Sequence, residues 1–224
     1  MNEFLNACRN GEIDIVKKLL SQADPSSSRD NFAIILASQN GHRDVVELLL
    51  GDSRVDPSVY DNYAIKWAAR NGHKDIVELL LKDLRIDPSA ENNEAIRWAV
   101  ANSQRDIVEL LLGDSRVDPS SEDNWAIRVA AQKGQHDIVE LLLRDSRVDP
   151  SADDNYAIRM AAYNGHRDVV KLLLGDPRVD PFTKYNDIIR WAASNGHKDI
   201  VELLEQHSYK IDNLHYSKLA AKLN

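Results

Sequence analysis

The amino-acid sequence predicts an all-α solenoid built from repeated helix–turn–helix–loop units. A short motif recurs along the 224 residues, and its aspartate falls at positions 14, 44, 75, 106, 137, 168 and 199. Successive aspartates are 30 residues apart once and 31 residues apart thereafter. A fixed period of about 20–50 residues indicates stacked supersecondary units, each of which contacts only its neighbours.

The first helix of a unit is predicted from the third period. Ile65, Ala68 and Ala69 follow the i, i+3, i+4 spacing that places side chains on one helix face. Asp61 or Asn62 is the expected N-cap, because a short polar side chain can accept hydrogen bonds from the first free amides. We therefore expect a helix from about residue 61 to residue 71.

The second helix is expected from about His73 to Lys82. Gly72 supplies the positive φ of the turn before it, and Asp75 lies in its first turn, where the helix dipole favours an anion. Pro88 then bars any continuation of helix in the connector. The same turn position holds glycine at residues 11, 41, 72, 134, 165 and 196, and the connectors hold Asp-Pro pairs at prolines 25, 57, 88, 119, 150 and 181.

The repeated motif resembles a known family. The run from Ala68 to Leu81 reads Ala-Ala-x-x-Gly-His-x-x-Ile-Val-x-x-Leu-Leu, which is similar to the second half of the ankyrin-repeat consensus. The family's Thr-Pro-Leu-His is replaced by Tyr-Ala-Ile-Lys at Tyr63–Lys66. The period is 31 residues against about 33 in the family. Because the missing residues fall in the loop that forms a β-hairpin finger there, we predict an all-α, ankyrin-like solenoid whose short finger loops can lack the hairpin.

We predict a single ankyrin-repeat domain over residues 1–224. Lys18 and Asn6 stand where later units carry leucine and tryptophan, as expected of a first unit with no preceding neighbour. The expected units are residues 1–29, 30–60, 61–91, 92–122, 123–153, 154–184 and 185–212, followed by a capping helix at 213–224.

The bulk properties limit the classes of function. A net charge of −8 favours solubility and argues against nucleic-acid partners. The single cysteine, Cys8, cannot form an internal disulfide and stands where other units carry alanine or serine, so we expect it in the core. No signal peptide or membrane-spanning run is apparent in the sequence. We expect a cytoplasmic, soluble monomer.

The sequence predicts no catalytic, cofactor-binding or metal-binding residues. Histidines recur at one position of the motif, but units that stack about 10 Å apart cannot share a zinc ion whose ligands lie about 2.0–2.1 Å away. We interpret them as residues of the second-helix start. No Cys/His pairing, nucleophile elbow or phosphate-binding loop occurs, so we expect no enzyme and no cofactor. The recurring histidines are His42, His73, His166 and His197.

Two basic ladders have a functional and a structural interpretation. Each could form a track for an acidic partner, or its members could pair with loop aspartates such as Asp52 and with carbonyls at helix ends. Strict repetition in every unit favours the structural interpretation, because a recognition surface is expected to differ between units. The first ladder is Lys66, Arg97, Arg128, Arg159 and Arg190, and the second is Arg54, Arg85, Arg116, Arg147 and Arg178.

The resemblance implies a concave binding face made of loop tips and first helices. Positions on that face that vary between units are the candidate partner-binding residues. Among them Tyr60, Arg70 and Tyr163 are of types enriched in binding hot spots. The acidic central tips suit a protein partner with a basic patch. The candidates are Arg29, Gln39, Val59, Tyr60, Arg70, Glu91, Ala101, Glu122, Gln132, Lys133, Asp153, Tyr163, Lys184 and Ser194.

The aromatic residues that open the first helices have two interpretations: they pack under the tips or they face a ligand. Glu94 interrupts this series in the fourth unit, where Ser103 also replaces the turn glycine. We expect either Asn102 to take the left-handed conformation or this turn to be the least stable. The series consists of Phe32, Tyr63, Trp125 and Tyr156.

The predicted function is a non-enzymatic module that binds a protein partner. The alternative is a passive structural or spacer array, natural or engineered, without a single dedicated partner. A small-molecule or enzymatic role would need a deep pocket with convergent polar groups, which the repeats do not supply.

Overall fold

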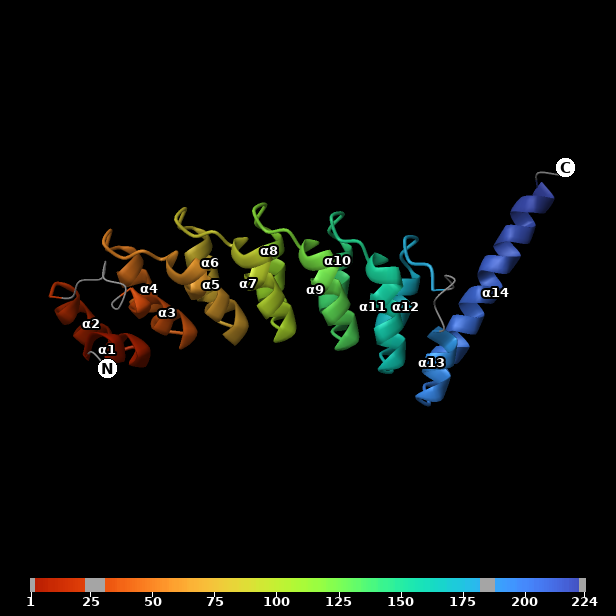
Figure 1. Ribbon diagram of the computed structural model, residues 1–224, viewed down its shortest axis with the longest axis horizontal. Helices are drawn as coiled ribbons and strands as arrows, with labels where there is room; N and C mark the ends of the chain where they lie inside the picture. Colours follow the sequence, from red (N-terminus) through yellow and green to blue (C-terminus); the bar gives the residue numbers. More distant parts are fainter. Residues whose placement is uncertain (1–2, 23–30, 182–187, 222–224) are drawn as a thin grey trace. The chain divides into compact units, whose positions relative to one another are not determined.

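The computed structural model describes residues 3–22, 31–181 and 188–221, with side chains up to residue 209 (Figure 1). These residues contain fourteen helices, and no strand occurs among them. The predicted all-α, helix–turn–helix–loop solenoid is confirmed. The chain divides into two compact units, Met1–Glu122 and Asp123–Asn224, and the division falls at a predicted boundary between repeats.

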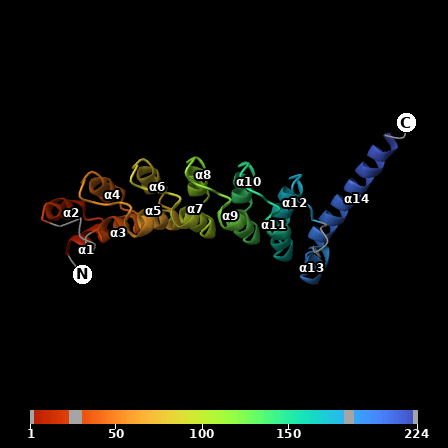
Figure 2. The same cartoon turned by 45° about the horizontal axis from the view of Figure 1, so that its top comes forward.

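The helices of the first unit form two rows. Figure 2 shows the odd-numbered helices in one row and the even-numbered helices in the other. Within each row every helix packs against the next, so that α1, α3, α5 and α7 form one layer and α2, α4, α6 and α8 the second. Their bounds are α1 (Glu3–Asn10), α2 (Ile13–Leu20), α3 (Phe32–Gln39), α4 (Arg43–Leu50), α5 (Val59–Asn71), α6 (Lys74–Leu81), α7 (Ala90–Ala101) and α8 (Arg105–Leu112).

The second unit continues the same pairing. Helix α11 packs against α12 and α13, and α12 packs against α10 and α14. Helix α9 begins at the boundary, so its first two residues belong to the first unit. The bounds are α9 (Ser121–Gln132), α10 (His136–Leu143), α11 (Ala152–Tyr163), α12 (Arg167–Leu174), α13 (Ile188–Ser194) and α14 (Lys198–Ala221).

Small residues let the first helices approach closely, and branched residues fill the space between the rows. Ala68 and Ala69 on α5 are fully buried, as is Ile65 between them and the finger loop. On α6 the side chains of Ile76 and Leu80 are also fully buried. Cys8 is buried without exposure, which confirms its predicted place in the core.

Four of the finger loops in the described part of the chain contain a left-handed turn where the family's longer loop forms a β-hairpin. Tyr60, Asp61 and Asn62 have φ of 51°, 54° and 64°, and the right-handed part of α5 follows them. Non-glycine residues adopt this conformation at a cost of about 1–2 kcal/mol each, which asparagine and aspartate reduce by local hydrogen bonding. The same turn recurs at Glu91–Asn93, at Glu122–Asn124 and at Asp153–Asn155.

The asparagine that ends each left-handed turn does not act as the N-cap that we expected. The Oδ1 of Asn62 accepts a hydrogen bond of 2.8 Å from the backbone N–H of Asp87, in the connector that ends the same repeat. The equivalent bond joins Asn93 to Asp118 at 2.7 Å. A buried amide thus links each finger to the following connector, and this link compensates part of the backbone strain.

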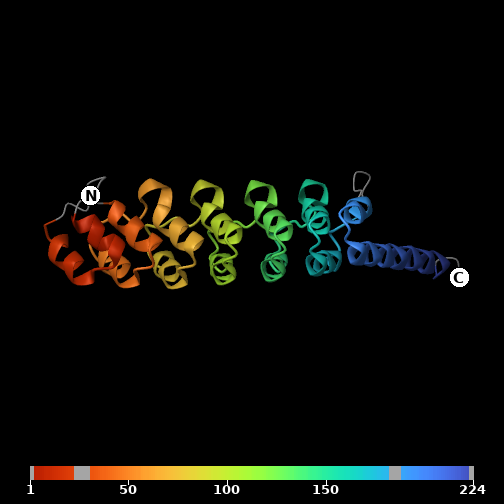
Figure 3. The same ribbon diagram turned by 90° about the horizontal axis from the view of Figure 1, so that it is seen from below.

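The two ends of the array differ in how far they follow the prediction. Asn6 and Lys18 are exposed, as expected for a first unit. At the other end, residues 213–221 continue α14 and do not form a separate capping helix (Figure 3). The connectors elsewhere carry an Asp-Pro pair, but no glycine or proline lies between Lys198 and Ala221, so nothing in this stretch stops the helix.

Candidate functional site

Five aromatic side chains form a continuous row along the first helices of the first unit. We call Phe32, Tyr60, Tyr63, Trp67 and Trp98 the aromatic row. The ring centroids of Phe32 and Tyr60 lie 5.9 Å apart, and those of Tyr60 and Tyr63 lie 6.4 Å apart. The Trp98 centroid lies 6.5 Å from that of Tyr63 and 5.4 Å from that of Trp67. These spacings and the edge-to-face geometry of the end pairs are favourable for aromatic contacts. The row joins α3, α5 and α7.

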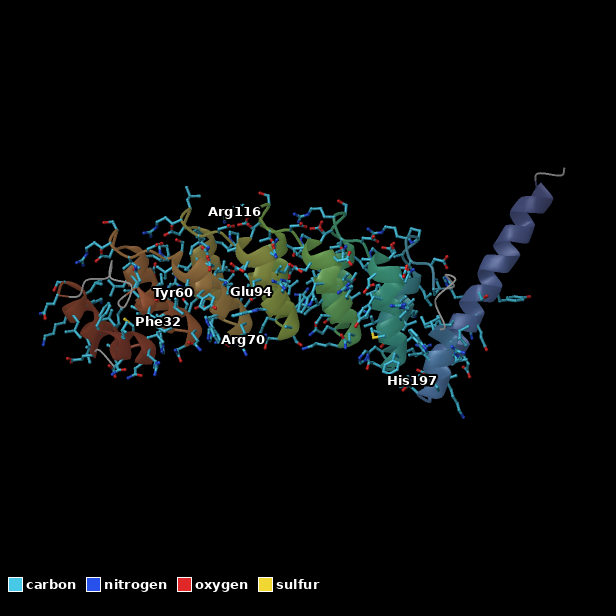
Figure 4. All side chains as sticks on the ribbon, in the orientation of Figure 1. Phe32, Tyr60, Arg70, Glu94, Arg116 and His197 are labelled. Carbon is cyan, nitrogen blue, oxygen red and sulfur yellow. The ribbon has the colours of Figure 1, made fainter. Side chains whose placement is uncertain are left out.

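The aromatic row is partly open to solvent. Tyr60 is 50% exposed and Tyr63 is 37% exposed, whereas Phe32, Trp67 and Trp98 are half-buried. Of the two interpretations of the aromatic series, Phe32 fits packing under a tip, because its ring and that of Tyr60 form a T-shaped contact. Both residues are labelled in Figure 4. Tyr63 fits both interpretations, because its ring packs against Tyr60 and Trp98 and is also partly exposed to solvent.

Two cations lie against the row. Lys66 places its Nζ 4.4 Å from the centre of the Tyr63 ring and 2.9 Å from Oε2 of Glu94. Arg70 places its guanidinium carbon 4.8 Å from the centre of the Trp67 ring and 5.5 Å from that of Trp98. Because these rings already bind cations within the chain, they have the electrostatic character needed to bind a cation from outside.

The second unit carries a similar alternation of cations and rings. The guanidinium of Arg128 lies 5.1 Å from the Tyr156 ring, and that of Arg159 lies 5.8 Å from the same ring and 5.6 Å from Trp191. Lys66, Arg128 and Arg159 of the first basic ladder therefore pack on aromatic rings, and Arg97 donates to the backbone oxygens of Glu91 and Asn92. These contacts support the structural interpretation of the ladder at these positions.

Acidic side chains of the finger tips contact polar or basic side chains of the neighbouring repeat. Asn92 donates a 2.6 Å hydrogen bond from Nδ2 to Oε1 of Glu122. In the second unit Nη1 of Arg128 lies 3.1 Å from Oδ2 of Asp153. Successive tips are thus close enough for side chains to bridge them.

The predicted partner-binding residues lie mainly at the surface. Gln39, Val59 and Ala101 are half-buried, and Arg29 and Lys184 lie outside the described residues. Tyr60 and Arg70 belong to or contact the aromatic row, which brings them onto one surface of the first unit. The exposed candidates are Tyr60, Arg70, Glu91, Glu122, Gln132, Lys133, Asp153, Tyr163 and Ser194.

The second basic ladder is structural, as predicted. Arg85 forms a paired contact with Asp83, with Nη2 lying 2.6 Å from Oδ2. It also donates to the backbone carbonyls of Leu50 at 3.1 Å and Val55 at 2.9 Å in the preceding repeat. The hydrogen bond from the Arg85 side chain holds the pKa of Asp83 below its usual value of 3.8. Arg116 repeats this arrangement with Asp114, at the loop end of the array in Figure 4.

The recurring histidines bind the preceding repeat, a role that the sequence did not reveal. The Nε2 of His73 lies 3.1 Å from the backbone oxygen of Gln39, and that of His197 lies 3.0 Å from the oxygen of Tyr163. Each ring packs over the turn glycine of the preceding repeat, so that a Cβ added to Gly41 would lie 2.7 Å from His73. The 31-residue recurrence of glycine followed by histidine is the signal that could have indicated it.

One group of side chains in the described part of the chain has the composition of a metal site. The ligand atoms of His136, Asp137 and Glu140 lie within 4.8 Å of one another. The imidazole of His136 is 3.1 Å from Asp137, and Glu140 accepts a 2.8 Å hydrogen bond from Arg144. These contacts account for the group as ordinary surface ion pairing on one helix.

Comparison with known protein families agrees with this architecture. The family model described as ankyrin repeats (3 copies) matches residues 4–92, 55–123 and 127–215. The chain belongs to the ankyrin-repeat family. Ankyrin-repeat proteins are typically non-enzymatic protein-interaction modules. A comparison with curated proteins gives no match.

None of the described helices of this ankyrin array has both the length and the apolar character to cross a bilayer.

Proposed function

We propose that this chain is a non-enzymatic module that binds a protein partner on the face formed by its first helices and finger tips. The observation that carries the proposal is the aromatic row, whose exposed rings lie on the same unit as the Arg70 guanidinium and acidic finger tips. Aromatic and arginine side chains dominate binding energy in protein interfaces.

The variation between repeats supports the same face. The second-helix positions repeat almost without change, and the loop arginines and turn histidines are occupied by contacts between repeats. Positions such as Tyr60 and Tyr163 differ from unit to unit and are exposed. A rigid stack that presents variable side chains loses little conformational entropy on binding.

The acidic tips lead us to propose a partner with a basic patch. Glu91 and Glu122 are exposed on neighbouring fingers of the first unit, and Asp153 extends the acidic set in the second. Opposite charge favours both the rate and the specificity of association. We take the chain to act as a cytoplasmic monomer, and the mass in solution by light scattering tests the oligomeric state.

The test is affinity capture from a cell lysate, with the bound proteins identified by mass spectrometry. The native chain is compared with a variant that carries Tyr60→Ala, Arg70→Ala and Tyr163→Ala. A matched control carries Lys74→Ala, Glu78→Ala and Lys171→Ala, because these side chains are exposed on second helices. All proteins must first show the same circular dichroism and melting temperature.

We expect a protein that the native chain and the control capture and the first-helix variant loses. A partner that all three proteins capture equally would contradict binding on the first-helix face. A chain that captures no reproducible partner would favour the passive array.

A further inference from the structure

The finger tips of the first unit form a row of carboxylates at fixed positions. Asp61, Glu91 and Glu122 are exposed, and each lies in a left-handed turn with φ of 54°, 53° and 52°. The asparagine that ends the turn is buried and, at Asn62 and Asn93, bonded to the next connector at 2.8 Å and 2.7 Å. Anchored in this way, the tips are held in place before any ligand binds.

The spacing of the tips follows from the stacking of the helices. First helices pack against one another, and packed helices lie about 8–10 Å apart. The 2.6 Å hydrogen bond between Asn92 and Glu122 shows that neighbouring tips keep this close separation at the loop end. A polyproline II chain rises about 3.1 Å per residue and has three residues per turn, so every third side chain lies on the same face and three residues match one repeat.

The aromatic rings beside the tips can bind lysine and arginine side chains through cation–π contacts. Tyr60 follows Val59 at the same turn position as Glu91, and its 50% exposed ring contacts Tyr63 at 6.4 Å between centroids. Within the chain, Lys66 and Arg70 already lie over rings of the aromatic row at 4.4 Å and 4.8 Å. Lysine and arginine bury their methylene stems on apolar surfaces while their charges reach acidic partners.

We propose that the tips of the first unit bind an extended basic segment of the partner, with arginine or lysine at every third position. Successive cations pair with Glu122 and Glu91 and then reach the exposed ring of Tyr60 beside Asp61. This inference rests on the proposed function and specifies the partner that the face recognises. The net charge of −8 adds attraction for such a segment at long range.

The first test uses two fluorescent peptides of identical composition. In one, arginine occupies every third position and glycine and proline lie between. In the other the arginines form one block. Fluorescence anisotropy with the full chain gives the dissociation constants at low and at physiological salt. We expect the spaced peptide to bind roughly tenfold more tightly, because only its charges match the repeat. Equal binding of both peptides, or no binding of either, would overturn the proposal.

The second test compares two double variants that remove the same charge. Glu91→Gln with Glu122→Gln alters the tips, and Glu78→Gln with Glu109→Gln alters exposed positions of the second helices. We expect the tip variant to weaken the spaced peptide roughly fivefold to tenfold and the control to weaken it less than about twofold. Equal effects would show that net charge alone attracts the peptide, which would contradict the inference.

The two proposals fail in distinguishable ways. If lysate capture depends on Tyr60, Arg70 and Tyr163 but no basic peptide binds, the first-helix face still binds a partner and the basic segment is wrong. If a captured partner is insensitive to those three residues, the proposed function itself fails.

Discussion

The Nζ of Lys66 lies 2.9 Å from Oε2 of Glu94, although only 2% of the lysine side chain is exposed. In the second unit the equivalent pair is Arg128 and Tyr156, whose guanidinium and ring lie 5.1 Å apart. The glutamate that interrupts the aromatic series is therefore a compensated replacement. An ion pair in one repeat takes the place of a cation–π contact in another.

Replacing Glu94 by glutamine should remove the carboxylate that neutralises the buried ammonium of Lys66 and leave it only an amide oxygen and the Tyr63 ring. Breaking a fully buried pair costs roughly 3–5 kcal/mol, and the carboxylate here is partly exposed, so we expect a loss of about 2–3 kcal/mol. Urea denaturation followed by circular dichroism measures it. Lys66→Arg with Glu94→Tyr recreates the second-unit arrangement and should recover most of the loss. A Glu94→Gln variant as stable as the native chain would contradict this role.

The glycine turns provide a matched pair of substitutions. Gly41 and Gly196 both have a left-handed backbone, with φ of +80° and +82°. An alanine Cβ at position 41 would lie 2.7 Å from His73, whereas at position 196 it would meet nothing within 4 Å.

We expect Gly196→Ala to cost about 1–2 kcal/mol from backbone strain alone, and Gly41→Ala to cost at least about 1 kcal/mol more. Chemical denaturation of both variants gives the difference. The combination of Gly41→Ala with His73→Ala removes the clash and, with it, the hydrogen bond to Gln39. If Gly41→Ala were no worse than Gly196→Ala, the packing of the histidine over the glycine would be refuted.

The loop aspartates should make stability depend on acid pH. Because Arg85 holds the folded-state pKa of Asp83 below 3.8, the folded state binds fewer protons there than the unfolded state. The contribution of Asp83 to stability is complete above the pKa of the unfolded state and is lost as the pH falls through the lower pKa of the folded state. Asp83→Asn should therefore destabilise by about 1–2 kcal/mol at neutral pH, and the difference from the native chain should shrink below about pH 4.

Urea midpoints measured between neutral pH and about pH 3 test this dependence. Glu78→Gln is the control, because it removes a carboxylate from an exposed position of α6. A destabilisation by Asp83→Asn that stayed constant over the whole range would argue against the ion pair.

The irregular turn of the fourth repeat offers a stabilising substitution. Ser103 itself has a φ of 60° and Asn102 a φ of −107°, so the first of our two alternatives, a left-handed Asn102, is wrong. The second alternative, that this turn is the least stable, stays a prediction. Ser103→Gly should relieve the strain and raise the free energy of unfolding by about 0.5–1 kcal/mol. Thermal melting measures the gain. A lower melting temperature would mean that contacts of the serine side chain outweigh the strain.

The repeat period and the helical spacing were enough to predict the helix pairs. The second helix was expected at residues 73–82 and is observed at Lys74–Leu81. The pairing of loop arginines with aspartates and helix-end carbonyls was also predicted, and Arg85 confirms it. Local charge and periodicity decide these features.

Features that depend on contacts between distant residues were harder to predict. The left-handed turn at Tyr60–Asn62 is accompanied by a hydrogen bond between Asn62 and Asp87, which are 25 residues apart. No local propensity requires either feature. The compensation of Glu94 by Lys66 likewise needs the register of two stacked helices. The separate tail helix was predicted by analogy with the other repeats, but the tail lacks their Asp-Pro stop.

The most direct test of the account is hydrogen–deuterium exchange of the chain alone and with its captured partner. We predict slower exchange on binding at the finger and first helix of residues 59–71 and 90–101, with little change in α4, α6 and α8. Protection confined to α4, α6 and α8 would contradict binding on the first-helix face.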